Sequence, residues 1–167
     1  NNQLITLPET IGNLSNLEFL HLPGNQLAAL PSTISTLPCL VSLNIDNNLF
    51  SAFPEGIMEL NTLRYVYMAN NAIQEIPSDM GTISTLYILS AFTNNISQIP
   101  SSIGDLDNLY YLDFANNELT DIPETICTIY DNLTVFNIGL NDICPPYPDC
   151  LTEADIGEQD TSECSEC

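Results

Sequence analysis

From Leu17 onwards the chain repeats one pattern of residues, with a spacing of 23 positions between the first five units and 24 before the sixth. In each unit the first, fourth and sixth positions are apolar, as in Leu63, Val66 and Met68. A single unit cannot bury these side chains alone, whereas stacked units share a continuous core. The repeat therefore predicts a solenoid of stacked coils. The units begin at Leu17, Leu40, Leu63, Leu86, Leu109 and Leu133.

Two further features of the unit indicate how each coil is built. The alternating apolar run at its start predicts a short strand, and strands of successive coils would pair in parallel, about 4.8 Å apart. A proline late in each unit fixes φ and cannot donate a hydrogen bond, which suits an extended segment outside the sheet. These prolines are Pro8, Pro31, Pro54, Pro77, Pro100 and Pro123.

The ninth position of every unit is asparagine. An amide side chain both donates and accepts hydrogen bonds, so it can satisfy backbone groups where the chain leaves the strand. We therefore expect a structural ladder of asparagines along the stack, without a catalytic role. Its members are Asn25, Asn48, Asn71, Asn94, Asn117 and Asn141.

The full pattern, L-x-x-L-x-L-x-x-N-x-L followed by L-P-x-x-I-x-x-L, resembles the leucine-rich-repeat family, in its 23-residue class with an L-P-x-x-I-G-x-L segment. The resemblance covers residues 2–143. It implies an α/β-type solenoid, a curved stack with a parallel β-sheet on the concave face and mostly irregular or 3-10 segments on the convex face. Residues 1–143 would form the repeats, with a partial first repeat and six strands starting near residues 17, 40, 63, 86, 109 and 133. Because the chain begins about eight residues into a repeat, we expect that residue 1 is not the natural start or that repeats precede it.

Residues 144–167 depart from the repeat and are rich in acidic residues and cysteine. They resemble the C-terminal caps of secreted bacterial leucine-rich-repeat proteins, through the run Cys-Pro-Pro-Tyr-Pro-Asp-Cys. Of the three connectivities that four cysteines allow, we expect Cys127 to pair with Cys144 and Cys150 with Cys164. Such disulfides are typical of an oxidising compartment. Two cysteines remain: Cys39, expected to be a small buried apolar residue, and Cys167, free or joined to another chain.

The charge balance limits the classes of partner. The chain carries 22 acidic residues, one arginine and no lysine, which gives a formal net charge of −21. Nucleic acid and anionic membrane surfaces require cations, so neither is an expected partner. No apolar run reaches the ~18–20 residues of a membrane span, so direct membrane insertion is not expected. Solubility in a salty environment would explain the acidity without any partner.

Solvent-facing strand positions would line the concave face, and aromatic residues gather there on three neighbouring strands. Exposed tyrosine with few charges is typical of the centre of a protein interface. Arg64 precedes Tyr87 in the same column, one strand apart, which permits stacking. Aromatic packing across strands would explain the cluster without a ligand. The candidate ligand-binding residues are Phe19, His21, Arg64, Tyr65, Tyr67, Tyr87, Phe92, Tyr110, Tyr111 and Asp113.

No catalytic arrangement can be identified in the sequence. His21 is the single histidine, and no nucleophile with an orienting acid lies at a readable spacing from it. We expect no enzyme activity, no cofactor and no metal site. The favoured function is a non-catalytic extracellular or cell-surface module that recognises a protein, peptide or glycan. One alternative is a structural, self-assembling surface protein that associates through its uncapped N-terminal coil. The other is an intracellular scaffold.

Overall fold

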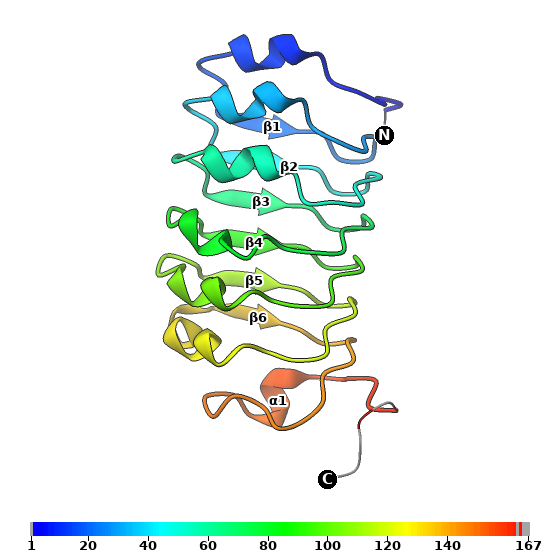
Figure 1. Ribbon diagram of the computed structural model, residues 1–167, viewed down its shortest axis with the longest axis vertical. Helices are drawn as coiled ribbons and strands as arrows, with labels where there is room; N and C mark the ends of the chain where they lie inside the picture. The colour runs from blue at the N-terminus through cyan, green and yellow to red at the C-terminus, as the bar shows by residue number, and fades with distance from the viewer. Residues whose placement is uncertain (1, 163, 165–167) are drawn as a thin grey trace.

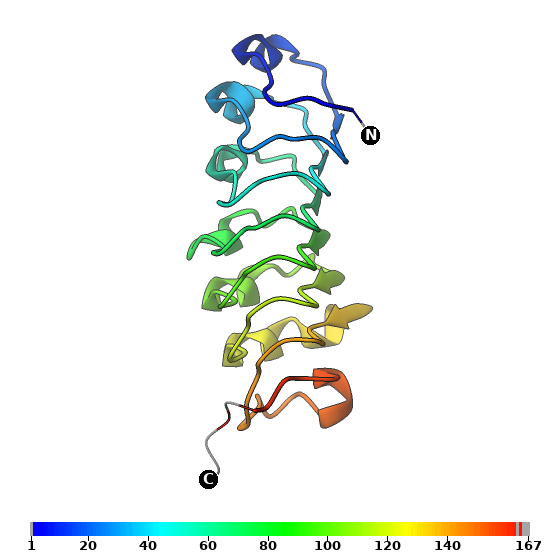
Figure 2. The same ribbon diagram turned by 90° about the vertical axis from the view of Figure 1, so that its right-hand side faces the viewer.

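The computed structural model, which describes residues 2–162 and 164, is a curved solenoid of stacked coils (Figures 1 and 2). One short strand from each full coil joins a single parallel sheet, in the order β1-β2-β3-β4-β5-β6. Each strand begins two residues after the first leucine of its unit, at the third position. The strands are β1 (Phe19–His21), β2 (Ser42–Asn44), β3 (Tyr65–Tyr67), β4 (Ile88–Ser90), β5 (Tyr111–Asp113) and β6 (Val135–Asn137).

The sheet register follows the repeat, so equivalent positions of successive coils lie side by side. Leu43 pairs with Val66, Val66 with Leu89, and Leu89 with Leu112. These central strand residues are fully buried, while the flanking strand residues point to the opposite face. The register thereby builds one core along the stack and one continuous strand face.

The side opposite the sheet consists of 3-10 segments, most of which follow a proline (Figure 2). Gly81 allows two of them to approach closely, because a Cβ atom there would clash with the Ser102 carbonyl oxygen. Met58 occupies the same position of its own unit, and η3 and η4 are the neighbouring pair that pack least closely. The segments are η1 (Glu9–Asn13), η2 (Ser32–Thr36), η3 (Glu55–Glu59), η4 (Met80–Thr82), η5 (Ser101–Asp105), η6 (Glu124–Thr128) and η7 (Tyr130–Asn132).

The predicted asparagine ladder is present, and each member links its own coil to the preceding one. Asn94 Oδ1 accepts a hydrogen bond from the Ile73 amide at 3.0 Å. Its Nδ2 donates to the carbonyl oxygens of Met68 at 3.0 Å and Ala91 at 2.9 Å. Since these groups are buried, the side chain satisfies backbone atoms that water cannot reach.

A glutamine of the cap continues this ladder. Gln159 Nε2 donates to the carbonyl oxygens of Ile138 at 2.9 Å and Ile156 at 2.8 Å. Its Oε1 accepts from the Ile143 amide at 3.3 Å, and Gln159 forms a parallel bridge with Asn141. The same three kinds of bond are made by every ladder asparagine from Asn48 to Asn141, so the cap is bonded to the last coil as one coil is to the next.

Two disulfides hold the cap, and their pairing differs from the prediction. Cys127 is bonded to Cys150 and Cys144 to Cys164, with a Cα–Cα distance of 5.6 Å in each. The expected pairs Cys127–Cys144 and Cys150–Cys164 are therefore wrong. Cys150 follows Cys127 by 23 residues, which is one period of the repeat, so the first part of the cap brings Cys150 beside Cys127 as the next coil would. The cap also contains the single α-helix of the described residues, α1 (Glu153–Ile156).

The expectation for Cys39 was also wrong. Its thiol is free and the residue is exposed, because it lies in the turn before Leu40 and not in the core. Cys167 lies outside the described residues.

The first coil leaves apolar side chains in contact with solvent. Leu4, Ile5 and Leu14 are exposed, whereas Leu27 and Leu37, the equivalents of Leu4 and Leu14 one period later, are buried. Self-association through this coil stays a prediction.

Candidate ligand-binding face

Side chains alternate in direction along each three-residue strand, and this alternation decides which residues lie on the strand face. In β3 the central Val66 is buried, so Tyr65 and Tyr67 point to the opposite face, where both are partly exposed. The residue just before each strand also reaches this face, which adds Tyr87 before β4 and Tyr110 before β5. Together with Tyr111 of β5, these residues form a group that we call the tyrosine cluster.

The rings of the tyrosine cluster contact one another across strands. The ring centroids of Tyr65 and Tyr87 are 6.1 Å apart in an edge-to-face arrangement, and those of Tyr87 and Tyr110 are also 6.1 Å apart. The Arg64 guanidinium lies 5.4 Å from the centroid of the Tyr87 ring, which confirms the predicted stacking. Tyr110 remains 41% exposed, so the cluster still offers aromatic surface to a partner.

The phenol groups influence one another and two nearby carboxylates. Partial burial raises the pKa of Tyr67, and the charges of Tyr110, Tyr65 and Asp46 raise it further. Partial burial also raises the pKa of Tyr111, together with the charge of Asp113 and a hydrogen bond to it. The raised pKa keeps the hydroxyls of Tyr67 and Tyr111 protonated at neutral pH, so each can donate a hydrogen bond.

Asp113 and Asp46 carry negative charge at the carboxyl-terminal side of the strands. Asp113 is only 7% exposed, and it accepts hydrogen bonds from the Ala115 amide at 3.1 Å and the Tyr111 hydroxyl at 3.4 Å. Asp46 accepts from the Ala69 amide at 2.7 Å and from Asn44 Nδ2 at 3.1 Å. Burial raises the pKa of both carboxyls above the ordinary value, although these hydrogen bonds oppose the rise. Asp46 was not among the predicted site residues, because its partial burial depends on side chains of other coils.

Three predicted residues do not join the tyrosine cluster. Phe19 and His21 lie on β1, where their rings form an edge-to-face pair at 6.1 Å, and His21 Nε2 is 2.9 Å from Ser42 Oγ. The strand β2 separates them from Tyr65 and Tyr67. Phe92 lies two residues beyond the end of β4, and within the described residues its ring forms no aromatic pair with the tyrosine rings. The candidate site therefore contains fewer residues than the set predicted from the sequence.

The Asp113→Asn variant is expected to be more stable than the wild type at pH 7. The carboxylate is ionised in both states at that pH, and its burial makes the charged form unfavourable only in the folded state. As pH falls through the raised pKa of the folded state towards the ordinary value of 3.8, the folded wild type takes up the proton first. The advantage of the variant should therefore shrink on acidification. Thermal unfolding between pH 7 and pH 4 measures this trend, and Asp121→Asn, an exposed residue, controls for the change in net charge. If Asp113→Asn and Asp121→Asn increased thermal stability equally at every pH, burial of the Asp113 charge would not explain the gain.

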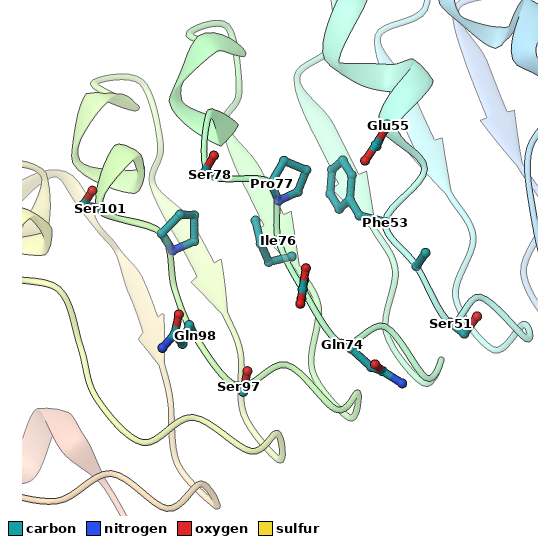
Figure 3. Close-up of a pocket in the computed structure, with 13 residues that line it drawn as sticks. Ser51, Phe53, Glu55, Gln74, Ile76, Pro77, Ser78, Ser97, Gln98 and Ser101 are labelled. Atoms are coloured by element: carbon teal, nitrogen blue, oxygen red, sulfur yellow. The ribbon is translucent and has the colours of Figure 1, made fainter.

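A separate cavity of about 700 Å³ lies on the flank of the solenoid, away from the strands (Figure 3). Its lining includes Glu55 of η3 and Ser101 of η5. Phe53 and Pro77 face each other across it, with serine, glutamine and glutamate side chains around them. The sequence analysis did not identify it. Its lining residues are Ser51, Ala52, Phe53, Glu55, Gln74, Glu75, Ile76, Pro77, Ser78, Ser97, Gln98, Pro100 and Ser101.

Within residues 2–162 and 164, no three histidine, cysteine or acidic side chains are grouped so as to hold a metal ion. In the same residues, no helix has the length and apolarity that a membrane crossing requires.

Comparison with known proteins places these features in a family. The model of the leucine-rich repeat matches residues 108–129, and no curated protein matches the sequence significantly. A leucine-rich-repeat protein of Leptospira interrogans of solved structure is 31% identical, with a TM-score of 0.70, over 85% of this chain and 42% of that one.

Two plant receptor structures are also similar. The Arabidopsis receptor kinase HAESA, in complex with the peptide hormone IDA and a co-receptor, is 26% identical, with a TM-score of 0.81, over 92% of this chain and 27% of that one. The ectodomain of the Arabidopsis thaliana receptor kinase GASSHO1, in complex with Casparian strip integrity factor 2, is 27% identical, with a TM-score of 0.77, over 95% of this chain and 23% of that one. The chain thus spans less than half the length of each of these proteins. The repeat, the stacked parallel sheet and these similarities together show that the chain is a leucine-rich-repeat protein.

Proposed function

We propose that this chain is a non-catalytic recognition module that binds a peptide or protein partner through the tyrosine cluster, outside the cell or at its surface. The observation that carries the proposal is the composition of the strand face: five of the chain's seven tyrosines lie on three neighbouring coils, with Arg64 stacked at their edge. Tyrosine supplies large contact area and a polar group at low conformational cost, which favours recognition.

The shape of the face supports a macromolecular partner. Small-molecule sites are usually concave cavities. The four most prominent cavities among the described residues lie on the flank and at the two ends of the stack, and none of these four is lined by the tyrosine cluster. A face without such a cavity is better suited to an extended peptide or a protein surface.

Two further observations support the proposal. The leucine-rich-repeat structures of HAESA and GASSHO1 were solved with a peptide hormone and an integrity factor, respectively. The two disulfides of the cap are typical of an extracellular location. The glycan alternative would use the same tyrosines, but no observation favours it over a peptide.

Selection from a displayed library of random peptides tests the proposal. The wild type alone serves as bait, and the enriched peptides are then titrated into Tyr65→Ala/Tyr111→Ala. We expect enriched peptides to bind the double variant at least about tenfold more weakly, because tyrosine is enriched among hot-spot residues, whose truncation costs about 2 kcal/mol or more. Leu49→Ala, which removes an exposed apolar side chain elsewhere, is the matched control and should leave binding unchanged. If selected peptides bind the double variant as tightly as the wild type, the tyrosine cluster is not the binding face.

A further inference from the structure

Two carboxylates flank the tyrosine cluster without a cationic partner. Among the described residues, neither Asp46 nor Asp113 forms an ion pair. Arg64, the single arginine of the chain, lies over Tyr87 at the opposite end of the strands, and His21 is next to Ser42. Each carboxylate is partly or largely removed from water and is held by a backbone amide. Charges in this position are stabilised strongly by an added cation, because the surroundings screen them less than bulk water does.

A polar group between them also has no partner within the described residues. Ser90 of β4 pairs with Tyr67 on one side and Asp113 on the other. It is only 4% exposed, and no hydrogen bond of its hydroxyl with another described residue was found. Since the preceding Leu89 points into the core, Ser90 points to the strand face. The hydroxyl is therefore available to a donor of a ligand that rests on this face.

The acceptors on this face fit arginine better than lysine. The carboxylate oxygens, the phenol oxygens of Tyr67 and Tyr111 and the Ser90 hydroxyl are distributed over several strands. A guanidinium presents five donors in one plane and also stacks on aromatic rings, so it can serve several separate acceptors at once. The net charge of −21 adds a long-range attraction for a basic partner.

We propose that two arginine side chains of the partner bind this face. One contacts Asp46 and Tyr67, and the other contacts Asp113, Ser90 and Tyr111. The inference rests on the proposed function and specifies the ligand: an extended peptide segment with two arginines. Asp46 and Asp113 lie three coils apart, roughly 15 Å at the usual spacing of strands. An extended chain covers that span in about four to five residues.

The probe for this inference is the peptide acetyl-Arg-Gly-Gly-Gly-Arg-amide, titrated into the ¹⁵N-labelled protein and followed by NMR. We expect shifts at the amides of Ala69 and Ala115, which bond to the two carboxylates. The same peptide with citrulline in place of arginine should bind about tenfold more weakly, because it keeps the shape and loses the charge-assisted hydrogen bonds. A peptide with the two arginines adjacent should also bind more weakly, since it reaches one carboxylate at a time.

Variants separate this site from a general attraction to an acidic protein. Asp46→Asn/Asp113→Asn keeps an acceptor for the two backbone amides and should weaken the probe about tenfold or more. Asp121→Asn/Glu124→Gln removes the same charge from exposed positions and should leave binding within about twofold. Equal binding of the spaced and adjacent peptides, or equal loss in both double variants, would overturn the inference. The proposed function would survive that result if library peptides without basic residues still depended on Tyr65 and Tyr111.

Discussion

The Asn94→Ala variant is expected to lose about 3 kcal/mol of unfolding free energy. The substitution leaves the buried Ile73 amide without an acceptor, which alone costs about 1–3 kcal/mol. The carbonyl oxygens of Met68 and Ala91 each lose one donor but keep a second, because Asn71 and Asn117 also donate to them. Urea unfolding monitored by circular dichroism measures the difference.

The neighbouring Asn95 provides the control for this experiment. It is exposed, and its side chain bonds only to Glu118 Oε1, at 2.7 Å. Asn95→Ala removes the same atoms from the next residue and should change stability by less than about 0.5 kcal/mol. Equal losses for the two variants would show that the ladder merely accompanies the fold and does not stabilise it.

Removal of the Cys127–Cys150 bond in Cys127→Ser/Cys150→Ser is expected to cost about 3 kcal/mol. The bond closes a loop with a sequence separation of 23 residues, and the unfolded chain gains conformational entropy when the loop opens. Thermal unfolding without reductant measures the loss. Cys39→Ser, at the exposed free thiol, is the control and should leave stability nearly unchanged.

The pairing itself can be tested directly by mass spectrometry. Pepsin suits this test because it cleaves at acidic pH, where disulfide exchange is slow, whereas trypsin would find a single arginine and no lysine. We expect a peptide containing Cys127 linked to one containing Cys150. Linkage of Cys127 to Cys144 would restore the pairing expected from the sequence and remove the basis for the stability estimate.

Features that depend on the period of the repeat could be predicted from the sequence. The strands, the asparagine ladder and the stacking of Arg64 on Tyr87 all follow from equivalent positions that lie side by side once the period is known. The equivalence of positions one period apart also indicates two features that the sequence analysis did not predict: the pairing of Cys127 with Cys150 and the exposure of Cys39. Cys150 lies one period after Cys127, and the positions equivalent to Cys39 are all polar, which indicates a solvent-exposed turn.

The remaining features depend on contacts that the period does not specify. Gln159 lies 18 residues after Asn141 and has a longer side chain, so neither spacing nor residue type identifies it as part of the ladder. The partial burial of Asp46 and the near-complete burial of Asp113 result from side chains of several coils together. The flank cavity is lined by residues of three successive coils, and its shape depends on how these coils pack.

The bonds of Gln159 have a consequence for the engineering of repeat proteins. They engage backbone groups of the last coil that every coil in this stack possesses, and they require no particular side chain there. Two side chains of the coil beneath are also required: Cys127, which bonds to Cys150, and Tyr130, whose hydroxyl bonds to the Asp155 carboxylate. The cap that begins at Cys144 should therefore be transplantable as an interchangeable terminator onto synthetic arrays of this repeat, once a cysteine and a tyrosine are installed at the positions of Cys127 and Tyr130.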